Sequence, residues 1–565
     1  MSNALLVALR RLRAPIILLV LLFSIGIVGL VMIPGTDEAG RASRMSIFDA
    51  LYFMSYTAST IGFGEIPQPF SRAQRVWVTL IIYASVIGWA YLVANLLALA
   101  QDRSFRVVLE SGRFRRQVRA LREPFYLICG FGETGALVGR ALDALALRFV
   151  VIDIREDRIQ ELELLDLAQD APAMVGNARV TDNLIAAGLT LPECRGVLAL
   201  TNDDQANLSV AISVRLLNPA VPILARAMTR ETTANLVSFG ADHVINPFAT
   251  FGEHLTVAIQ SPGSHRLLTW LAGLPGTTLR PETAPPRGRW IVCGYGRFGS
   301  EVVRAFRGQY LDVTIIDPDE ADPDGPHVVR GLGTEAGTLE QAGVRNAVGI
   351  VAGTDDDVSN LSIAVTAREL NPGVFTIVRQ NLRANHPLFD AYGADVTMVS
   401  SEVIAKQCLA LLQTPLLSRF LEAVKHKDDA WADLAIDRLQ KVIGEDAPDI
   451  WRFSVNAVDA PACHEALGHA DYPITLKDLC RDPADRERHL ECVPLLVLRA
   501  STSLILPDEA LPVQRDDEIL FAGRPAARSA QRSVLVNLNV RDYAVRGLDL
   551  PGGWLWQRLS RRPAP

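Results

Sequence analysis

Two stretches without a charged side chain constrain the fold of this chain more than any other feature. Residues 15–33 and residues 76–100 are predominantly apolar, and an α-helix of ~20 such residues crosses the hydrocarbon core of a bilayer. A cleaved signal peptide has a shorter apolar core, and here a second apolar stretch follows the first. We therefore expect two membrane-spanning helices, in preference to a helical hairpin buried in a soluble protein.

Arginines lie at both outer ends of this two-helix unit. They are Arg10, Arg11, Arg13, Arg103, Arg106, Arg113, Arg115, Arg116, Arg119 and Arg122. Segments rich in Lys and Arg stay on the cytoplasmic side of a membrane. The sequence therefore predicts a multi-pass protein of the cell (inner) membrane with both termini in the cytoplasm.

The segment between the two apolar stretches does not read as an ordinary loop. Ser46, with Asp49 three residues later, is typical of a helix N-cap. Residues 47–56 then predict a short apolar helix, too short to span a bilayer, which runs into residues 57–65. Non-helical backbone at membrane depth is tolerated only where it is buried in protein or lines a water-filled path. We expect a re-entrant pore helix followed by a pore-lining loop.

Glycines in this loop alternate with larger residues, in the order Thr60, Ile61, Gly62, Phe63 and Gly64. Glycine adopts backbone angles that would clash with a Cβ atom, so successive carbonyl groups can point the same way. Carbonyls from symmetry-related chains can then replace the hydration shell of a dehydrated cation. We predict a selectivity filter here, with the Thr60 hydroxyl at its inner end.

Residues 60–65 resemble the filter signature of potassium channels, usually written Thr-Val-Gly-Tyr-Gly-Asp. The resemblance implies a homotetramer that conducts K⁺ through its backbone carbonyls. Three positions depart from the pattern: Ile61 is a mild change, Phe63 loses a hydroxyl that can brace the filter, and Glu65 is longer than Asp. These departures leave open a weakly selective cation channel. Gly88, in the middle of the second apolar stretch, is either a gating hinge or a close-packing site.

From residue 124 onward the chain contains an internal duplication. Each copy opens with an apolar strand, the pattern Gly-x-Gly-x-x-Gly and a helical pattern, starting at Gly130 and at Gly294, an offset of 164 residues. Asp153 and Asp317 keep this offset, whereas residues 240–242 match residues 393–395 at an offset of 153. The shrinking offset indicates loop deletions within one duplicated domain.

The glycine pattern, with an acidic residue ~20 positions later, is the fingerprint of a dinucleotide-binding α/β fold. The glycines form a tight turn, let the backbone approach a pyrophosphate, and open a helix whose N-terminus attracts phosphate. In the first copy the candidate contacts are Gly130, Phe131, Gly132, Glu133, Thr134, Gly135, Asp153, Arg155, Asn177, Ala178, Thr201, Asn202 and Arg226. In the second copy they are Gly294, Gly296, Arg297, Phe298, Gly299 and Asp317.

The candidate contacts leave the nucleotide unidentified. Asp153 suits the ribose hydroxyls of NAD, but Arg155 suits the extra phosphate of NADP, and ADP or ATP is also possible. A Rossmann scaffold with an empty cleft is the alternative at either copy.

The duplicated unit resembles the regulator-of-K⁺-conductance (RCK) domain, also called the Trk-type NAD-binding (TrkA-N) domain. The resemblance rests on the glycine turn, the terminal Asp, residues 200–203 with residues 353–355, and Arg226 with Arg379. It implies a ring of such domains beneath the pore, two per chain and eight per tetramer. A regulatory ligand, NAD or another adenine nucleotide, would change the shape of this ring and so pull on the inner helices.

The expected fold is a membrane α-helical pore domain followed by two α/β Rossmann-like domains and a small α+β C-terminal lobe of the TrkA-C type. The expected segments are the pore domain (1–100), a linker (101–123), the first RCK domain (124–261), a linker (262–289), the second RCK domain (290–425) and the lobe (450–540). Residues 403–424 predict one amphipathic helix at the end of the second domain, and Trp451, Phe453 and Val455 alternate as in a half-buried strand.

Two groups of residues are candidate metal ligands. Asp319, Glu320, Asp322 and Asp324 offer the oxygen atoms that Ca²⁺ prefers, although a solvated acidic loop is the simpler interpretation. Cys463, His464, His469, Cys480, His489 and Cys492 lie close together, but their spacing matches no zinc motif.

Charge and chemistry favour a channel over two other classes of protein. The net charge of −7 gives no support to binding of nucleic acid. A membrane-anchored NAD-dependent oxidoreductase would explain the glycine turns but not the filter signature, and no His, Lys or Tyr stands out as its proton donor. We expect a ligand-gated potassium channel in contact with membrane lipid, and no enzyme.

Overall fold

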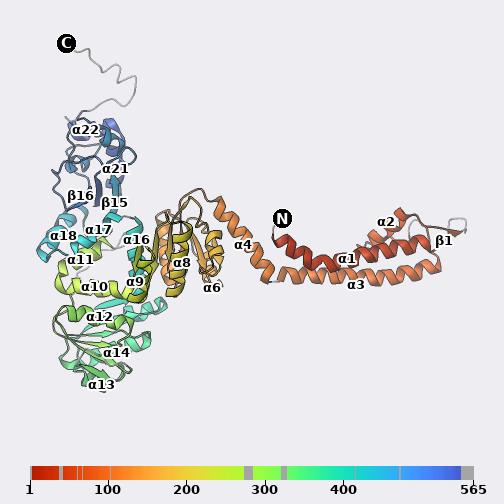
Figure 1. The fold of residues 1–565 in the computed structure, drawn as a ribbon, viewed down its shortest axis with the longest axis horizontal. Coiled ribbons are helices and arrows are strands. Elements are labelled where there is room, and N and C mark those ends of the chain that lie inside the picture. Colours follow the sequence, from red (N-terminus) through yellow and green to blue (C-terminus); the bar gives the residue numbers. More distant parts are fainter. Residues whose placement is uncertain are drawn as a thin grey trace, which may run out of the picture. The chain divides into compact units, whose positions relative to one another are not determined.

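The computed structural model describes residues 3–36, 42–59, 61–65, 68–101, 103–272, 284–319, 327–413, 415–469 and 472–548. The chain divides into two compact units. The N-terminal unit holds residues 1–122 with two short segments, 172–174 and 185–191, and the C-terminal unit holds the remainder. Figure 1 labels the elements of both.

The N-terminal unit is helical. Its elements are α1 (Asn3–Met32), β1 (Gly35–Thr36), β2 (Ala42–Ser43), α2 (Ile47–Ala58), α3 (Arg72–Gln101) and α4 (Arg103–Ala120). Two stretches are long and apolar enough to cross a membrane, Leu12–Met32 and Arg72–Leu99. Only about a fifth of their residues are buried, 17% and 22%, so most of their apolar surface suits contact with lipid.

Glycines let α1 and α3 pack closely side by side (Figure 1). A Cβ atom at Gly29 would lie 2.1 Å from the Trp77 ring, and the Trp77 indole N–H donates to the Gly26 carbonyl at 3.4 Å. Gly88 also meets α1, because a Cβ atom there would lie 2.8 Å from Leu22. This contact favours the close-packing interpretation of Gly88, and its role as a hinge stays a prediction.

The short helix α2 forms as the sequence predicts. The Ser46 hydroxyl accepts a hydrogen bond from the Asp49 backbone N–H at 3.1 Å and donates to the Asp49 carboxylate at 2.6 Å, which confirms the predicted N-cap. Its apolar side, with Phe53, Met54 and Tyr56, is buried against α1 and α3. This packing fixes where the loop after α2 begins.

Residues 125–399 form two six-stranded sheets with the same strand order. The first is ordered β5-β4-β3-β6-β7-β8 and the second β11-β10-β9-β12-β13-β14. The strands of the first are β3 (Phe125–Cys129), β4 (Arg148–Asp153), β5 (Ala173–Val175), β6 (Cys194–Ala199), β7 (Ile223–Arg226) and β8 (His243–Ile245). Those of the second are β9 (Arg289–Cys293), β10 (Asp312–Asp317), β11 (Val328–Arg330), β12 (Gly349–Ala352), β13 (Phe375–Gln380) and β14 (Val396–Val399). The repeated order confirms two Rossmann-like folds.

Helices follow the strands in both domains. In the first they are α5 (Glu133–Ala144), α6 (Glu156–Glu163), α7 (Thr181–Ala186), α8 (Asp204–Leu217), α9 (Arg230–Ser238) and α10 (Pro247–Gln260). In the second they are α12 (Arg297–Gly308), α13 (Ala336–Gln341), α14 (Asp357–Leu370), α15 (His386–Tyr392) and α16 (Ser400–Gln413), with 3₁₀ turns at Val344–Asn346 and Arg383–Asn385. The last helix of each domain packs on the other domain. Helix α10 packs on α12, and α16 packs on α5.

Two expectations about this region need correction. The expected linker 262–289 begins with a helix, α11 (Pro262–Leu271), because Leu267, Trp270 and their apolar neighbours are buried in a core. The single helix expected over residues 403–424 is two helices, α16 and α17 (Pro415–Val424). The second of these helices begins at Pro415, and proline suits the first position of a helix because its missing N–H would have no partner there.

The C-terminal lobe is an antiparallel sheet with helices. Its elements are α18 (Asp429–Ile443), β15 (Asp449–Ser454), α19 (Pro461–Ala466), α20 (Leu476–Leu479), β16 (Cys492–Arg499), β17 (Thr502–Ile505), β18 (Glu518–Gly523), α21 (Pro525–Val536) and α22 (Leu538–Arg546). The strand order is β15-β18-β16-β17, so β15 and β17 are the edges. The α+β lobe expected from the sequence is confirmed.

Candidate functional site

The loop after α2 has the backbone that a carbonyl-lined filter requires. Gly62 and Gly64 have positive φ angles of 68° and 94°, whereas Ile61 and Phe63, which precede them, do not. Left-handed residues that alternate with right-handed ones turn successive carbonyls toward the same side, and only glycine adopts them without strain. The remaining filter candidate, Thr60, lies outside the described residues.

Tyr56 of the pore helix braces this loop. Its phenolic O–H donates to the Gly64 carbonyl oxygen at 2.6 Å, and its ring meets the Phe63 ring edge-on at a centroid distance of 5.5 Å. The Tyr56 carbonyl also accepts the Ile61 backbone N–H at 2.9 Å. Phe63 was expected to cost the filter a bracing hydroxyl, and Tyr56 donates one to the loop at Gly64.

Glu65 ties the end of the loop to α3. Its two carboxylate oxygens accept from the Arg75 guanidinium at 2.8 and 3.0 Å, and one of them also accepts the Phe70 backbone N–H at 2.9 Å. A bidentate Arg–carboxylate pair fixes direction as well as distance. Neither Tyr56 nor Arg75 was a sequence candidate, since nothing in the local pattern marks either as a partner of the filter.

The first glycine turn connects β3 to α5. Gly130 has φ 98°, and a Cβ atom there would lie 2.8 Å from the Thr201 backbone nitrogen. A Cβ atom at Gly135 would lie 2.3 Å from the Gly130 carbonyl oxygen, whereas one at Gly132 would meet nothing within 4 Å. The turn is therefore sterically closed toward the protein and open at Gly132, the side on which a phosphate would approach the start of α5.

Asp153, at the end of β4, holds this turn in place. One carboxylate oxygen accepts the Phe131 backbone N–H at 2.5 Å and the other accepts the Arg155 backbone N–H at 2.8 Å. The residue is 8% exposed. The Arg155 side chain forms an exposed ion pair with Asp157, so in this conformation it is not directed at a ligand phosphate.

The remaining candidates of the first domain line the ends of the neighbouring strands. Asn177 accepts the Arg179 backbone N–H at 2.9 Å, and Thr201 donates to the buried Asn207 at 2.7 Å. Thr134 and Ala178 are buried, so they would shape the site by packing and not by direct contact with a ligand. Asn202 accepts from the Arg226 guanidinium at 2.7 Å. These side chains form the rim that follows β5, β6 and β7.

Arg226 is a half-buried cation on this rim. Burial lowers its pKa, the carboxylate of Asp204 opposes this change, and the charge of Arg297 adds to it. Arg297 belongs to the second glycine turn, so cations from both domains act on the same region. A phosphate group would offset this repulsion.

Glu133 is already engaged with the other domain. One of its carboxylate oxygens accepts the Arg383 backbone N–H at 3.0 Å, and the other accepts from the Ser401 hydroxyl at 3.5 Å. The first residue of α5 is thus in contact with the second domain. Glu133 and Arg383 lie 250 residues apart in sequence, so no local sequence pattern predicts their contact.

The second glycine turn repeats the backbone of the first. Gly294 has φ 90°, a Cβ atom at Gly299 would lie 1.8 Å from the Gly294 carbonyl oxygen, and Gly296 again faces open space. Asp317 accepts the backbone N–H groups of Tyr295 at 2.7 Å and Asp319 at 3.0 Å. Asp153 and Asp317, the predicted ribose contacts, therefore also anchor the backbone of their turns.

The side chains around the second turn differ from those of the first. Phe298 is fully buried, and a Cβ atom at Gly353 would lie 2.7 Å from its ring. Arg379 is only 7% exposed, pairs with Asp355 at 2.6 Å and lies over the Phe248 ring at 4.9 Å. Burial lowers the pKa of Arg379, against the nearby Asp355 carboxylate.

The metal candidates gain no support from the described residues. Within them, no three His, Cys, Asp or Glu residues are grouped so that they could hold a metal ion. Glu320, Asp322 and Asp324 lie outside the described residues, and the carboxylate of Asp317 serves the glycine turn. The cysteines of the zinc candidate, Cys463, Cys480 and Cys492, are free and buried.

Comparisons with known families agree with the domain content. Residues 16–102 match the family described as "Ion channel". Residues 126–247 and 290–400 match the family described as "TrkA-N domain". The two matches therefore fall on the N-terminal helices and on both glycine-turn domains.

Several curated proteins resemble part of the chain. Potassium channel protein 1 of Methanocaldococcus jannaschii is 27% identical over 42% of this chain and 68% of its own length. Probable potassium channel protein 2 of the same organism is 27% identical over 38% of this chain and 62% of its own. An uncharacterized protein of Methanothermus fervidus is 27% identical over 44% of this chain, which spans only 36% of that protein.

Solved structures that resemble this chain include two of the GsuK channel. The structure titled "GsuK Channel" is 18% identical, covers 94% of this chain and 98% of its own, and has a TM-score of 0.46. The structure titled "GsuK channel bound to NAD" is 18% identical, covers 93% and 98%, and has a TM-score of 0.43.

Proposed function

This chain joins an ion-channel domain to two TrkA-N domains, the architecture of a two-helix potassium channel with RCK domains, and from this premise we propose that it forms a potassium-selective pore gated by an adenine nucleotide. K⁺ would pass through this pore, and no covalent bond would be made or broken. The protein would be a homotetramer in the cell (inner) membrane, surrounded by lipid, with both termini in the cytoplasm.

The observation that carries the proposal is the loop between α2 and α3. Alternating left-handed glycines at Gly62 and Gly64 supply a short file of carbonyls at the end of a helix too short to span a bilayer. One chain supplies one wall of such a filter, so a closed ring of carbonyls needs four copies. K⁺ would exchange its hydration shell for the carbonyl oxygens of residues 60–63, because the Gly64 oxygen accepts the Tyr56 hydroxyl.

Two side-chain anchors favour high selectivity over the weakly selective alternative. A filter discriminates between cations only while its carbonyls stay at a fixed separation or field strength. The Tyr56 hydroxyl holds the Gly64 carbonyl to α2, and the Glu65–Arg75 pair holds the next residue to α3. They support a filter that holds its shape despite the replacement of the usual Tyr by Phe63.

The first glycine turn is the better nucleotide site of the two. Gly132 leaves open space at the N-terminus of α5, Asp153 lies where a ribose would be held, and Arg226 adds positive charge on the rim. NAD or another adenine nucleotide would place its phosphates against Gly132 and its ribose at Asp153. At the second turn, the acidic segment after Asp317 disfavours a phosphate.

Ligand binding at the first turn would act on the contact between the domains. Glu133 lies at the start of α5 and bonds to Arg383 and Ser401 of the second domain, while α16 packs along α5. A phosphate bound beside Glu133 would alter these bonds. A nucleotide with different affinities for two arrangements of the domains would then shift the balance between closed and open pores.

The direct test is the reversal potential of the purified full chain in a planar bilayer under a K⁺/Na⁺ gradient. The proposal expects reversal close to the K⁺ equilibrium potential and a current that changes when NAD⁺ is added on the side of the TrkA-N domains. Reversal near zero would favour the weakly selective cation channel. No current with any adenine nucleotide, together with NADH formation from a candidate substrate, would favour the anchored oxidoreductase.

A further inference from the structure

The segment that follows β4 determines which ribose the first glycine turn can accept. Asp153 ends β4 and lies where the 2′-hydroxyl of an adenosine ribose would be held. NADP carries a phosphate on that oxygen, and a site that binds it needs a cation beside this position. The arginines around Asp153 therefore separate NAD from NADP as the ligand.

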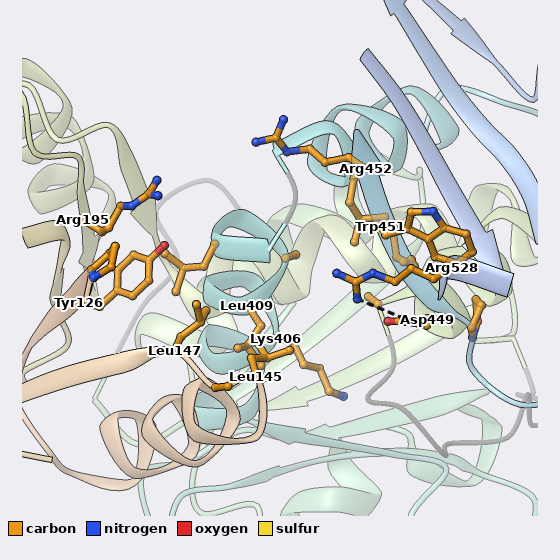
Figure 2. Close-up of a pocket in the computed structure, with 18 of the residues that line it drawn as sticks. Tyr126, Leu145, Leu147, Arg195, Lys406, Leu409, Asp449, Trp451, Arg452 and Arg528 are labelled. Carbon is orange, nitrogen blue, oxygen red and sulfur yellow. Dashed lines mark hydrogen bonds and ion pairs between the residues drawn. The ribbon is translucent and has the colours of Figure 1, made fainter. Parts of the chain in front are cut away.

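The arginines at the opposite edge of the first sheet lie too far away to serve. Strands β3, β4 and β6 are parallel and begin at the same edge. Arg148 and Arg195 lie at that edge, where they line a cavity of about 610 Å³, and Figure 2 labels Arg195 there. Asp153 is at the other end of β4, about 16 Å from Arg148 at ~3.3 Å per residue. A 2′-phosphate would depend on cations that follow β4.

Both arginines that follow Asp153 closely already have a carboxylate partner. The Arg155 backbone N–H donates to Asp153 at 2.8 Å, which keeps the residue beside the ribose position. Its guanidinium forms a bidentate pair with Asp157, in which Nε lies 3.0 Å from one carboxylate oxygen and a terminal nitrogen donates to the other. Arg158 donates to Glu161 at 2.6 Å.

The position of Arg155 in α6 explains why acidic residues hold it. Arg155 is the N-cap of this helix, where Ser, Thr, Asp and Asn are preferred, and its side chain caps no backbone N–H. A cation at this end opposes the helix dipole, whereas Glu156 and Asp157 in the first turn suit it. The bond between the side chains raises the pKa of Arg155 and lowers the pKa of Asp157, so both groups are charged at neutral pH.

A 2′-phosphate beside Asp153 would meet more negative charge than positive charge. An exposed ion pair is weak, so Arg155 could exchange Asp157 for a phosphate. The exchange would leave the Asp157 carboxylate without its partner, next to a phosphate that already faces Asp153. Glu156 adds a third carboxylate at the start of α6, and like charges brought together oppose binding. An uncharged ribose hydroxyl meets no such repulsion.

We propose that Asp157 determines the specificity of the first glycine turn. By holding the Arg155 guanidinium, it makes the turn accept nucleotides with a free ribose 2′-hydroxyl, such as NAD and ADP, and reject those with a 2′-phosphate, such as NADP. Asp157 is a positioning residue that acts through Arg155. This specificity rests on the proposed function, because it concerns the ligand of the same site. It is particular to the first turn, since Asp319 stands at the position of Arg155 in the second copy.

The test compares NAD⁺ with NADP⁺, which differ only in the 2′-phosphate. Isothermal titration calorimetry uses the full chain in nanodiscs of uncharged lipid, carrying Gly296→Glu so that the second turn rejects phosphate. NAD⁺ should bind at least about tenfold more tightly than NADP⁺, which corresponds to ~1.4 kcal/mol. Contacts that both nucleotides share cancel in this ratio, so it reports on the surroundings of the 2′ position.

Substitutions at Asp157 separate positioning from a merely structural role. Asp157→Asn removes the charge that holds Arg155, so NADP⁺ affinity should rise by about tenfold while NAD⁺ affinity changes by less than about twofold. Asp157→Glu keeps the ion pair and should keep the preference for NAD⁺. Adding Arg155→Gln to Asp157→Asn should abolish the gain for NADP⁺, because the phosphate then has no cation. A structural role alone would shift both affinities together.

The matched control is Glu163→Gln, which removes a carboxylate from the last position of α6 and leaves the pair of Arg155 with Asp157 intact. Its ratio of the two affinities should stay within about twofold of the wild-type ratio. The side chains of Arg155 and Asp157 are 58% and 54% exposed, so all these variants should keep the melting temperature of the wild type.

Three results would overturn the specificity and leave the nucleotide site in place. The wild type binds NADP⁺ as tightly as NAD⁺. Asp157→Asn leaves the ratio of the two affinities unchanged. The gain for NADP⁺ persists after Arg155→Gln is added, so that another group holds the phosphate. If the wild type bound neither nucleotide at about 1 mM, the proposed nucleotide site itself would be refuted, and the specificity with it.

Discussion

The first and second glycine turns have the same backbone in different surroundings. Both begin with a left-handed glycine, both close with a glycine pressed on a carbonyl oxygen, and both are anchored by an aspartate. Next to the first turn stand Glu133, Thr134 and Leu200, and the corresponding residues at the second are Arg297, Phe298 and Gly353. Phe298 fills the space that Gly353 leaves.

This difference separates two kinds of constraint. Positions where a side chain would collide with the backbone are unchanged between the copies, because no other residue fits. At positions that contact the other domain or face the cleft, the side chains differ between the copies. Glu133 corresponds to Arg297, of opposite charge, and Thr134 and Leu200 correspond to Phe298 and Gly353, of different size. The scaffold of both domains thus follows from sterics, whereas the capacity to bind a ligand depends on side chains that differ. The predictions below test each part of this comparison.

The largest expected effect is on folding. A Cβ atom at Gly135 or Gly299 would lie 2.3 or 1.8 Å from a carbonyl oxygen, so Gly135→Val and Gly299→Val should each lower the free energy of unfolding by more than about 4 kcal/mol. Thermal unfolding and yield of the full chain measure this. The controls Gly132→Ala and Gly296→Ala should stay within about 1 kcal/mol of the wild type. Tolerance of valine at only one turn would refute the shared backbone.

The next effect is on nucleotide affinity. Gly132→Glu places a carboxylate in the open space at the start of α5, and Gly296→Glu does the same at α12. We expect the first to weaken NAD⁺ binding by about 30-fold or more and the second by less than about 3-fold, since a tenfold change corresponds to ~1.4 kcal/mol. Isothermal titration calorimetry measures both variants. Equal losses would mean that the turns share the ligand.

A smaller effect concerns the packing that distinguishes the second turn. Gly353→Leu brings a side chain into the Phe298 ring, and Phe298→Thr removes that ring from the core. Together they recreate the first turn, so the double variant should be more stable than the sum of the single losses, by roughly 1–3 kcal/mol. Denaturant unfolding of the four proteins gives this coupling. If the free-energy losses of the two single variants simply add, the side chains at positions 298 and 353 are not energetically coupled.

The smallest expected effect concerns the charge beside the first turn. Glu133→Gln keeps an oxygen for the Arg383 N–H but removes a negative charge from the N-terminus of α5. NAD⁺ affinity should rise by about 2- to 5-fold, in line with ~0.3–1 kcal/mol for a charge at a helix end. Calorimetry compares it with Arg297→Gln, which should not raise affinity. A loss of affinity in Glu133→Gln would mean that the carboxylate itself accepts a bond from the ligand.

Much of this fold follows from patterns that extend only a few residues. The two spans, the Ser46 cap of α2 and both glycine turns rest on composition, capping or steric rules that act within one element. The duplication adds a check, because the second copy repeats the strand order of the first. The sequence placed Asp153 and Asp317 at the ends of strands as ribose contacts, and that role stays a prediction.

The remaining features depend on contacts between distant segments. Residues 262–271 resemble a linker in composition, but α11 forms because α17 and α18 cover its apolar side. The bond of Glu133 to Arg383 and the ion pair of Arg230 with Glu301 at 2.6 Å join different domains. The Tyr56 brace was missed because the familiar brace belongs to a filter tyrosine that this chain lacks. The start of α17 at Pro415 was within reach of the sequence, since proline is favoured at the first position of a helix.

The central claim is that a nucleotide at the first glycine turn controls the pore. Single-channel recording of the wild type, Gly132→Glu and Gly296→Glu in planar bilayers, with NAD⁺ titrated on the side of the TrkA-N domains, tests it most directly. The account predicts that NAD⁺ changes the open probability of the wild type and of Gly296→Glu, but not of Gly132→Glu, while all three keep the same reversal potential. A Gly132→Glu channel that responds to NAD⁺ as the wild type does would contradict it.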